Sequence, residues 1–139
     1  MEKFLQKYRE AGLKLTPQRI AILTFLDGNT GHPTAEEIFA AVRETHPTVS
    51  FATVYNTLQA LKTRGQLTEV TINPERKHFD PNTEPHHHAM CSECDKIVDI
   101  FDDFSEALKL PKDVGAGFDG FSVTGNHVEF YGVCGDCTE

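Results

Sequence analysis

The sequence lacks any apolar stretch long enough to cross a membrane. Its 139 residues contain no run that approaches the roughly 20 apolar residues of a membrane-spanning helix. It opens with Met1-Glu2-Lys3-Phe4-Leu5-Gln6, without the apolar segment of a signal peptide. We therefore expect a cytoplasmic protein with no membrane partner. In a reducing compartment, paired cysteines are more often metal ligands than disulfides.

The chain also lacks the usual sequence signatures of enzyme sites. Neither a G-x-S-x-G nor a Walker pattern is present. The segment Gly115-Ala116-Gly117-Phe118-Asp119-Gly120 matches G-x-G-x-x-G. A dinucleotide site needs that motif between a strand and a helix, whereas here it follows a predicted short helix and leads into a predicted strand. We expect a flexible loop there, and a protein that is not an enzyme.

Positive charge is scarce in the second half of the chain. Residues 1–80 carry 10 Lys and Arg against 9 Asp and Glu, a net charge of +1, whereas residues 81–139 carry 3 against 12, a net charge of −9. Only the N-terminal part can therefore approach phosphates without strong repulsion. The hydrophobic fraction of 39% is modest, and small domains with thin cores usually need a metal, a disulfide or a partner.

The first part of the chain has helical periodicity. Thr16 is a predicted N-cap before Pro17, Ser50 is a predicted N-cap of the last helix, and Thr34 with Glu37 forms a predicted capping box. The predicted helices cover 3–13, the segment from Pro17 to Gly28, the segment from Thr34 to Pro47, and 50–64. The pattern then changes to period two at Thr68, Val70 and Ile72, and 77–80 returns as a second strand after a turn at 73–76.

Helices followed by a two-stranded ribbon predict a winged helix-turn-helix. The fold class is α+β, with a winged-helix domain over 1–80, a hinge over 81–85 and a small α/β domain over 86–139. In the second domain we expect a strand over 97–101 and a short helix at Phe104, Ala107 and Leu108. A hairpin is predicted there from strands over 121–124 and 128–133, joined at Gly125-Asn126.

Two Cys-x-x-Cys pairs, separated by 39 residues, predict a structural zinc site. Each pair can place two sulfurs on one ion, and two pairs complete the tetrahedron that zinc prefers with thiolates. No coordination position is left for a substrate. The alternatives are redox dithiols or buried free thiols, but a thioredoxin-like motif needs a βαβ context that is absent. The four predicted ligands are Cys91, Cys94, Cys134 and Cys137.

Histidines are frequent, with seven in the chain and three together just before Cys91. On a strand, His86 and His88 point to one face and His87 to the other. With nearby carboxylates they offer nitrogen and oxygen ligands suited to Fe(II), Mn(II) or Zn. The candidate ligands of such a site are His32, Asp80, His86, His88 and Asp99. The spacing leaves open a second interpretation, an exposed polar hinge without a metal.

Five segments resemble the ferric uptake regulator (Fur) superfamily, over nearly all of the chain. They are Leu15-Thr16-Pro17-Gln18-Arg19, His32-Pro33-Thr34-Ala35, Ala52-Thr53-Val54-Tyr55-Asn56, His86-His87-His88-Ala89-Met90-Cys91-Ser92-Glu93-Cys94 and Tyr131-Gly132-Val133-Cys134-Gly135-Asp136-Cys137. The resemblance implies a homodimeric, metal-dependent repressor with an N-terminal DNA-binding domain, a C-terminal dimerisation domain and structural Zn²⁺. It also implies that His32, Asp80, His86, His88 and Asp99 hold a regulatory Fe²⁺ or Mn²⁺.

The peroxide-stress branch of this superfamily is most similar. Asp99 stands where iron-sensing relatives usually have Glu, and Asn56 where they usually have Arg. In that branch, Fe(II) and hydrogen peroxide oxidise a ligand histidine, expected here at His32 or His86, which releases the repressor from DNA. Pro85 and Asn126 replace two histidines of a further metal site, for which we expect a solvated surface. His87, Glu106 and His127 lie near that place and leave another ion possible.

The predicted partner is double-stranded operator DNA. A two-fold dimer places its reading helices in successive major grooves, so the operator should be near-palindromic. Base edges are the expected partners of Thr53, Tyr55 and Asn56, although Tyr55 can instead be a packed helix residue. Phosphates are the expected partners of Lys62 and Arg64, and Arg76 and Lys77 of the wing are placed to reach the backbone or minor groove.

Three other functions compete with a peroxide-responsive repressor. The first is a sensor of iron, manganese or zinc availability from the same superfamily. The second is a hydrolytic zinc enzyme using His86, His88 and an aspartate, which a five-ligand cage disfavours because it leaves little room for substrate and water. The third is a zinc-stapled interaction module that does not bind DNA.

Overall fold

The computed structural model describes residues 2–109, 120–121 and 123–138. The chain forms two compact units, Met1–Thr83 and Glu84–Glu139. Their boundary falls within the segment predicted to be a hinge. Most of the G-x-G-x-x-G segment lies outside the described residues. Within the described part of the chain, no helix is both long and apolar enough to span a bilayer.

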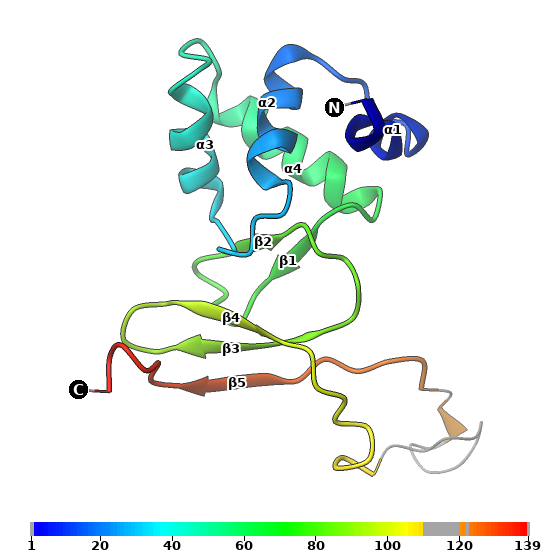
Figure 1. The fold of residues 1–139 in the computed structure, drawn as a ribbon, viewed down its shortest axis with the longest axis vertical. Helices are drawn as coiled ribbons and strands as arrows, with labels where there is room; N and C mark the ends of the chain where they lie inside the picture. Colours follow the sequence, from blue (N-terminus) through cyan, green and yellow to red (C-terminus); the bar gives the residue numbers. More distant parts are fainter. Residues whose placement is uncertain (1, 110–119, 122, 139) are drawn as a thin grey trace. The chain divides into compact units, whose positions relative to one another are not determined.

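The first unit begins with four helices, α1 Glu2–Glu10, α2 Pro17–Leu26, α3 Ala35–Arg43 and α4 Phe51–Thr63 (Figure 1). Hydroxyl oxygens of Thr16, Thr34 and Ser50 accept the backbone N–H three residues later, so each predicted N-cap is confirmed. The capping box of Thr34 and Glu37 is also present. Helix α1 ends three residues earlier than predicted, and the chain then turns at Gly12, where φ is 86°.

Apolar faces of these helices meet in a single cluster of fifteen buried side chains. Ile22, Ile38, Val54 and Leu58 are fully buried in it. Strands β1 Thr68–Val70 and β2 His78–Asp80 form an antiparallel ribbon, and Phe79 of β2 joins the same cluster. Helices packed on a two-stranded ribbon confirm the predicted winged helix-turn-helix.

The second unit contains a three-stranded sheet with the order β4-β3-β5 (Figure 1). Strand β3 His87–Cys91 pairs antiparallel with β4 Ile97–Ile100 and parallel with β5 Glu129–Gly132. Because β3 and β5 run in parallel, their C-terminal ends meet at the same edge of the sheet. Residues that follow these two strands are therefore brought together although the chain separates them widely.

Two predictions for this unit are wrong within the described residues. The hairpin at Gly125-Asn126 does not form, because β5 pairs with the central strand β3 and the described residues of 121–124 are not in a strand. The short helix is reduced to a hydrogen-bonded turn, in which the Leu108 N–H donates to the Phe104 carbonyl at 2.9 Å. At the predicted hairpin, the local turn signal was outweighed by pairing between distant segments.

Candidate functional site

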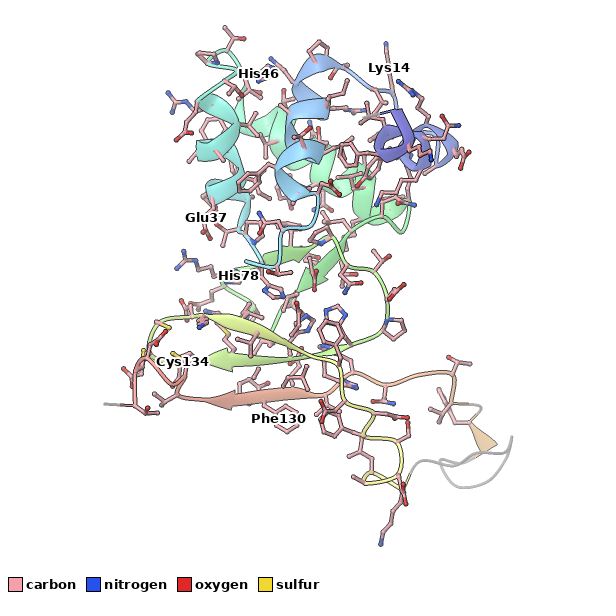
Figure 2. The ribbon with its side chains drawn as sticks, in the orientation of Figure 1. Lys14, Glu37, His46, His78, Phe130 and Cys134 are labelled. Atoms are coloured by element: carbon pink, nitrogen blue, oxygen red, sulfur yellow. The ribbon has the colours of Figure 1, made fainter. Side chains whose placement is uncertain are left out.

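The four cysteines form one cluster at the shared end of β3 and β5. Cys91 ends β3 and Cys94 lies in the following turn, while Cys134 and Cys137 follow β5. The four sulfur atoms lie within 4.8 Å of one another, and Figure 2 shows sulfur gathered near the label of Cys134. The Ser92 N–H donates to the Gly132 carbonyl at 2.8 Å, which joins the two turns.

Electrostatics within the cluster favours a bound cation. The Cys134 N–H donates to Cys91 Sγ at 3.3 Å, and this hydrogen bond chiefly lowers the pKa of the Cys91 thiol to about 6. Interaction with the Cys134 side chain raises the pKa of Cys137 to about 12. None of the four forms a disulfide. Four adjacent thiolates repel one another unless a cation neutralises them, and a tetrahedral set of sulfurs fits zinc.

In the first unit, the structure pairs His32 with Asp80. The distance from His32 Nε2 to Asp80 Oδ2 is 3.5 Å. His32 has a φ of 50°, in the left-handed region that residues other than glycine rarely adopt. The next two residues bind the wing, since the Pro33 carbonyl accepts the Phe79 N–H at 2.8 Å and Thr34 bridges to His78. The wing thus holds the backbone that carries His32.

His78 also supports this pair, a role that was not predicted from the sequence. His78 Nδ1 lies 2.7 Å from the His32 carbonyl oxygen and can donate a hydrogen bond to it. His78 is the first residue of β2 and is buried, and it supports the backbone conformation that presents the His32 ring. His78 and Asp80 are two residues apart on a strand and therefore share a face. That alternation could have placed His78 on the face of Asp80, but it gives no signal of the contact with the His32 carbonyl.

In the second unit, the structure brings together His86, His88 and Asp99. Asp99 Oδ1 lies 3.0 Å from His86 Nε2 and 3.3 Å from His88 Nε2. His88 and Asp99 are direct partners in the β3–β4 ladder, so the sheet register sets this contact. The predicted shared face of His86 and His88 is therefore confirmed. Imidazole and carboxylate groups on this face suit Fe(II), Mn(II) or Zn.

His87 points away from that set. Its ring centroid lies 5.0 Å from that of Phe104, and its Nδ1 accepts the Val128 N–H at 2.8 Å. Among the described residues, no cluster of three or more metal-binding side chains includes His87, Glu106 or His127. Instead, His127 Nε2 lies 2.9 Å from His88 Nδ1. The pKa of His127 is lowered, chiefly because burial removes water from its charged form.

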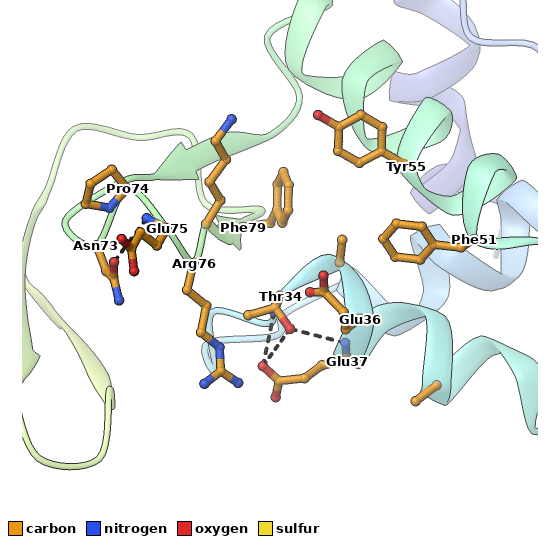
Figure 3. A pocket seen from close by; sticks show the side chains of 13 residues that line it. Thr34, Glu36, Glu37, Phe51, Tyr55, Asn73, Pro74, Glu75, Arg76 and Phe79 are labelled. Atoms are coloured by element: carbon orange, nitrogen blue, oxygen red, sulfur yellow. Dashed lines mark hydrogen bonds between the residues drawn. The ribbon is translucent and has the colours of Figure 1, made fainter.

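The exposed side of α4 carries two of the three residues predicted to contact bases. Tyr55 and Asn56 are exposed, and the Tyr55 ring stacks on that of Phe51 at 6.4 Å. Tyr55 is thus not packed in the core. Thr53 is half-buried, and its hydroxyl lies 2.9 Å from the Ser50 hydroxyl of the N-cap. Tyr55 lines an open hollow of about 830 Å³ between α4, the start of α3 and the wing turn (Figure 3).

The lysines predicted to contact phosphates are bound by a carboxylate. Glu69 of β1 pairs with Lys62 of α4 and, at 3.4 Å, with Lys77 of the wing. The hydrogen bond from Lys62 is the main cause that lowers the pKa of Glu69. Arg64 Nη1 donates to the Ala60 carbonyl at 3.2 Å, and Arg76 is exposed in the wing turn. Glu69 is therefore part of this basic surface.

The chain belongs to the ferric uptake regulator family, whose model matches residues 10–131. It is 39% identical, over its whole length and 91% of the relative's length, to the peroxide-responsive repressor PerR of Staphylococcus epidermidis.

Two solved structures extend the comparison. The structure of PerR from Streptococcus pyogenes is 32% identical, with a TM-score of 0.53, and the match covers 99% of this chain and 92% of that one. The ferric uptake regulator of Vibrio cholerae is 27% identical, with a TM-score of 0.76, and the match covers 94% of this chain and 98% of that one.

Proposed function

We propose that this protein is a metal-dependent transcriptional repressor that binds operator DNA as a homodimer and leaves it when hydrogen peroxide oxidises a ligand histidine. The observation that carries the proposal is the pair of histidine–carboxylate sets, His32 with Asp80 in one unit and His86 and His88 with Asp99 in the other. The resemblance to peroxide-responsive repressors supports the function given to these sets.

The proposed regulatory step is the binding of one ion by ligands from both units. In the proposal, His32 and Asp80 supply ligands from the winged unit, and the remaining three ligands come from the C-terminal unit. Ligands on separate units favour one relative arrangement when the ion is bound, and DNA selects that arrangement. Zinc at Cys91, Cys94, Cys134 and Cys137 is structural, because four thiolates leave no open position.

DNA binding is proposed for α4 and the wing. Tyr55 and Asn56 are exposed on α4 and are available to base edges, while Arg76 lies in the wing turn and can reach phosphates. Thr53 and Arg64 flank this surface, and Lys62 and Lys77 belong to it. The homodimer forms through the C-terminal unit, where Phe130, Tyr131 and Val133 are exposed apolar residues.

Peroxide sensing is proposed to act on the ligands themselves. Bound Fe(II) would supply the redox chemistry that cleaves the peroxide O–O bond. One oxygen atom is then added to the imidazole of His32 or His86, and the other leaves as water. The oxidised ring is a poorer ligand, so the two units lose their connection and the repressor leaves DNA.

The test uses a DNA duplex selected from a random library by the Mn(II)-loaded protein. We expect the Fe(II) protein to lose this duplex after peroxide, with a gain of 16 Da on peptides containing His32 or His86, while the Mn(II) protein keeps binding. Unchanged masses on both peptides would refute peroxide sensing. If neither the Fe(II) nor the Mn(II) protein binds any duplex, the result would favour an interaction module without a DNA role.

A sensor of metal availability is the second candidate. The similarity to a ferric uptake regulator supports it, because that relative is 27% identical over nearly the whole chain. In this case DNA binding follows the concentration of iron, manganese or zinc, and peroxide has no effect at constant metal occupancy. Titration of duplex binding with each metal, with and without peroxide, separates the two functions.

A further inference from the structure

We propose that His127 is a positioning residue that binds Nδ1 of His88 and thereby leaves Nε2 of His88 available to the regulatory ion. The inference rests on the proposed function, in which His88 is a ligand. His127 Nε2 lies 2.9 Å from His88 Nδ1, and the two rings cross at 62°. On the other side of the same ring, His88 Nε2 faces Asp99.

The two contacts of His88 select one tautomer. A neutral imidazole carries a single N–H, and the nitrogen without it has the lone pair that binds a metal. If Nδ1–H of His88 donates to His127, Nε2 keeps its lone pair on the side of Asp99. A hydrogen-bond partner on the second nitrogen is the usual way in which proteins orient a ligand histidine.

The position of His127 is fixed by the sheet. The next residue, Val128, donates its N–H to His87 Nδ1 at 2.8 Å and accepts the His88 N–H at 3.2 Å. Behind the ring, His127 Nδ1 lies 3.5 Å from Glu129 Oε1. This carboxylate favours a proton on Nδ1 of His127, which makes Nε2 an acceptor. Glu129, His127 and His88 thus form one consistent chain of contacts.

The comparison with His86 shows why this contact can be tested. His86 Nδ1 lies 2.6 Å from the Glu84 carbonyl oxygen, a backbone group that no side-chain substitution removes. For His88 the corresponding partner is a side chain. The alternative role of His127, as a ligand of a further ion with His87 and Glu106, requires that it either use Nδ1 for the ion or release His88 from Nε2.

The first experiment measures Mn(II) affinity of the full-length zinc protein by competition with a fluorescent chelator. His127→Phe keeps a planar ring but has no acceptor, whereas His127→Gln places an amide oxygen near the former Nε2. We expect binding about tenfold weaker or more for His127→Phe, the usual effect of losing such a partner, and rescue to within about threefold by His127→Gln. Equal affinity of His127→Phe and the original protein, or equal weakening of both variants, would overturn the inference.

A second measurement observes the tautomer directly. In ¹⁵N-edited NMR spectra with diamagnetic Zn(II) as the regulatory ion, we expect a slowly exchanging Nδ1–H signal of His88 that His127→Phe abolishes and His127→Gln retains. Zinc content at the cysteines serves as the folding control. A second Mn(II) equivalent that disappears in both His127 variants would identify an ion ligand instead and refute the positioning role.

His88→Ala separates the two proposals. If this variant binds Mn(II) as tightly as the original protein, the ligand assignment of the proposed function is wrong. If His88→Ala loses Mn(II) while His127→Phe keeps it, only the positioning role is wrong.

Discussion

The two units of this chain are each stabilised by a different kind of interaction. The winged unit buries fifteen side chains in one hydrophobic cluster. Among the described residues of the C-terminal unit, the buried hydrophobic side chains are Met90, Cys91 and Ile97. A sheet of three short strands with so few buried groups gains little from the hydrophobic effect, and the cysteine cluster lies where two of those strands end.

Under the proposed function, this difference assigns separate tasks to the cysteines and to the histidine–carboxylate sets. The cysteine cluster fixes the C-terminal end of β3, and the same strand carries His88 three residues earlier. In the winged unit the equivalent support is the wing itself, which binds the His32 segment through His78 and Phe79. One histidine–carboxylate set is thus supported by a proposed zinc site and the other by the wing, whose Phe79 joins the hydrophobic cluster.

The largest expected effect comes from breaking the cysteine cluster. Cys94→Ser should unfold the C-terminal unit, because binding of structural zinc supplies about 10–16 kcal/mol in small zinc domains, more than such a unit can replace. NMR spectra should lose the dispersed signals of the described residues from 84 onward and keep those of 2–83. Glu93→Gln, which changes an exposed neighbour, is the control. Retention of dispersed signals from both units in Cys94→Ser would contradict the comparison.

A substitution in the hydrophobic cluster should destabilise the winged unit and leave the C-terminal unit folded. Leu58→Ala removes a fully buried side chain of α4 and should destabilise the winged unit by about 2–5 kcal/mol. Denaturant unfolding followed by NMR should show an earlier transition for that unit, while the zinc content stays at one ion per chain. Gln59→Ala, at the next position of the helix, is the control. Loss of zinc in Leu58→Ala would show that the units do not fold separately.

The smallest effect is expected at Glu69. Glu69→Gln removes the carboxylate that binds Lys62 and Lys77 and frees both ammonium groups for phosphates. Both lysine side chains are about half-exposed, whereas the Glu69 side chain is only 8% exposed. Ion pairs that water reaches on one side contribute on the order of 1 kcal/mol each, so DNA binding should tighten only a few-fold and become more dependent on salt. Glu44→Gln, which removes the same charge at the end of α3, is the matched control. Equal tightening of DNA binding in both variants would mean that the change in net charge, and not the release of Lys62 and Lys77, causes the effect.

The winged unit was largely predictable because its signals are local. Thr16, Thr34 and Ser50 begin their helices through hydrogen bonds that span three residues, so a short window of sequence contains them. The C-terminal sheet depends on pairing of β3 with β5 across about 40 residues, and the Gly125-Asn126 pattern wrongly favoured a local hairpin. The Cys-x-x-Cys spacing nevertheless identified the four cysteines that this pairing joins.

The supporting contacts of the histidines were not predictable. The roles of His78 and His127 depend on which ring nitrogen meets which neighbour, and Glu69 binds lysines from two different elements. Such contacts are set by sheet register and side-chain conformation, which one sequence does not encode in its local pattern. The face shared by His86 and His88 was predictable from strand alternation, although β3 begins only at His87.

The most direct test of the central proposal, that one regulatory ion is shared by both units, is Mn(II) affinity in matched variants of the full-length protein. His32→Ala changes the winged unit, Asp99→Ala changes the C-terminal unit, and His46→Ala is the control. We predict one tight site per chain in the original protein and in His46→Ala, and a large, similar loss of affinity in each of the other two. Tight binding that survives either His32→Ala or Asp99→Ala would mean that a single unit holds the ion and would contradict the account.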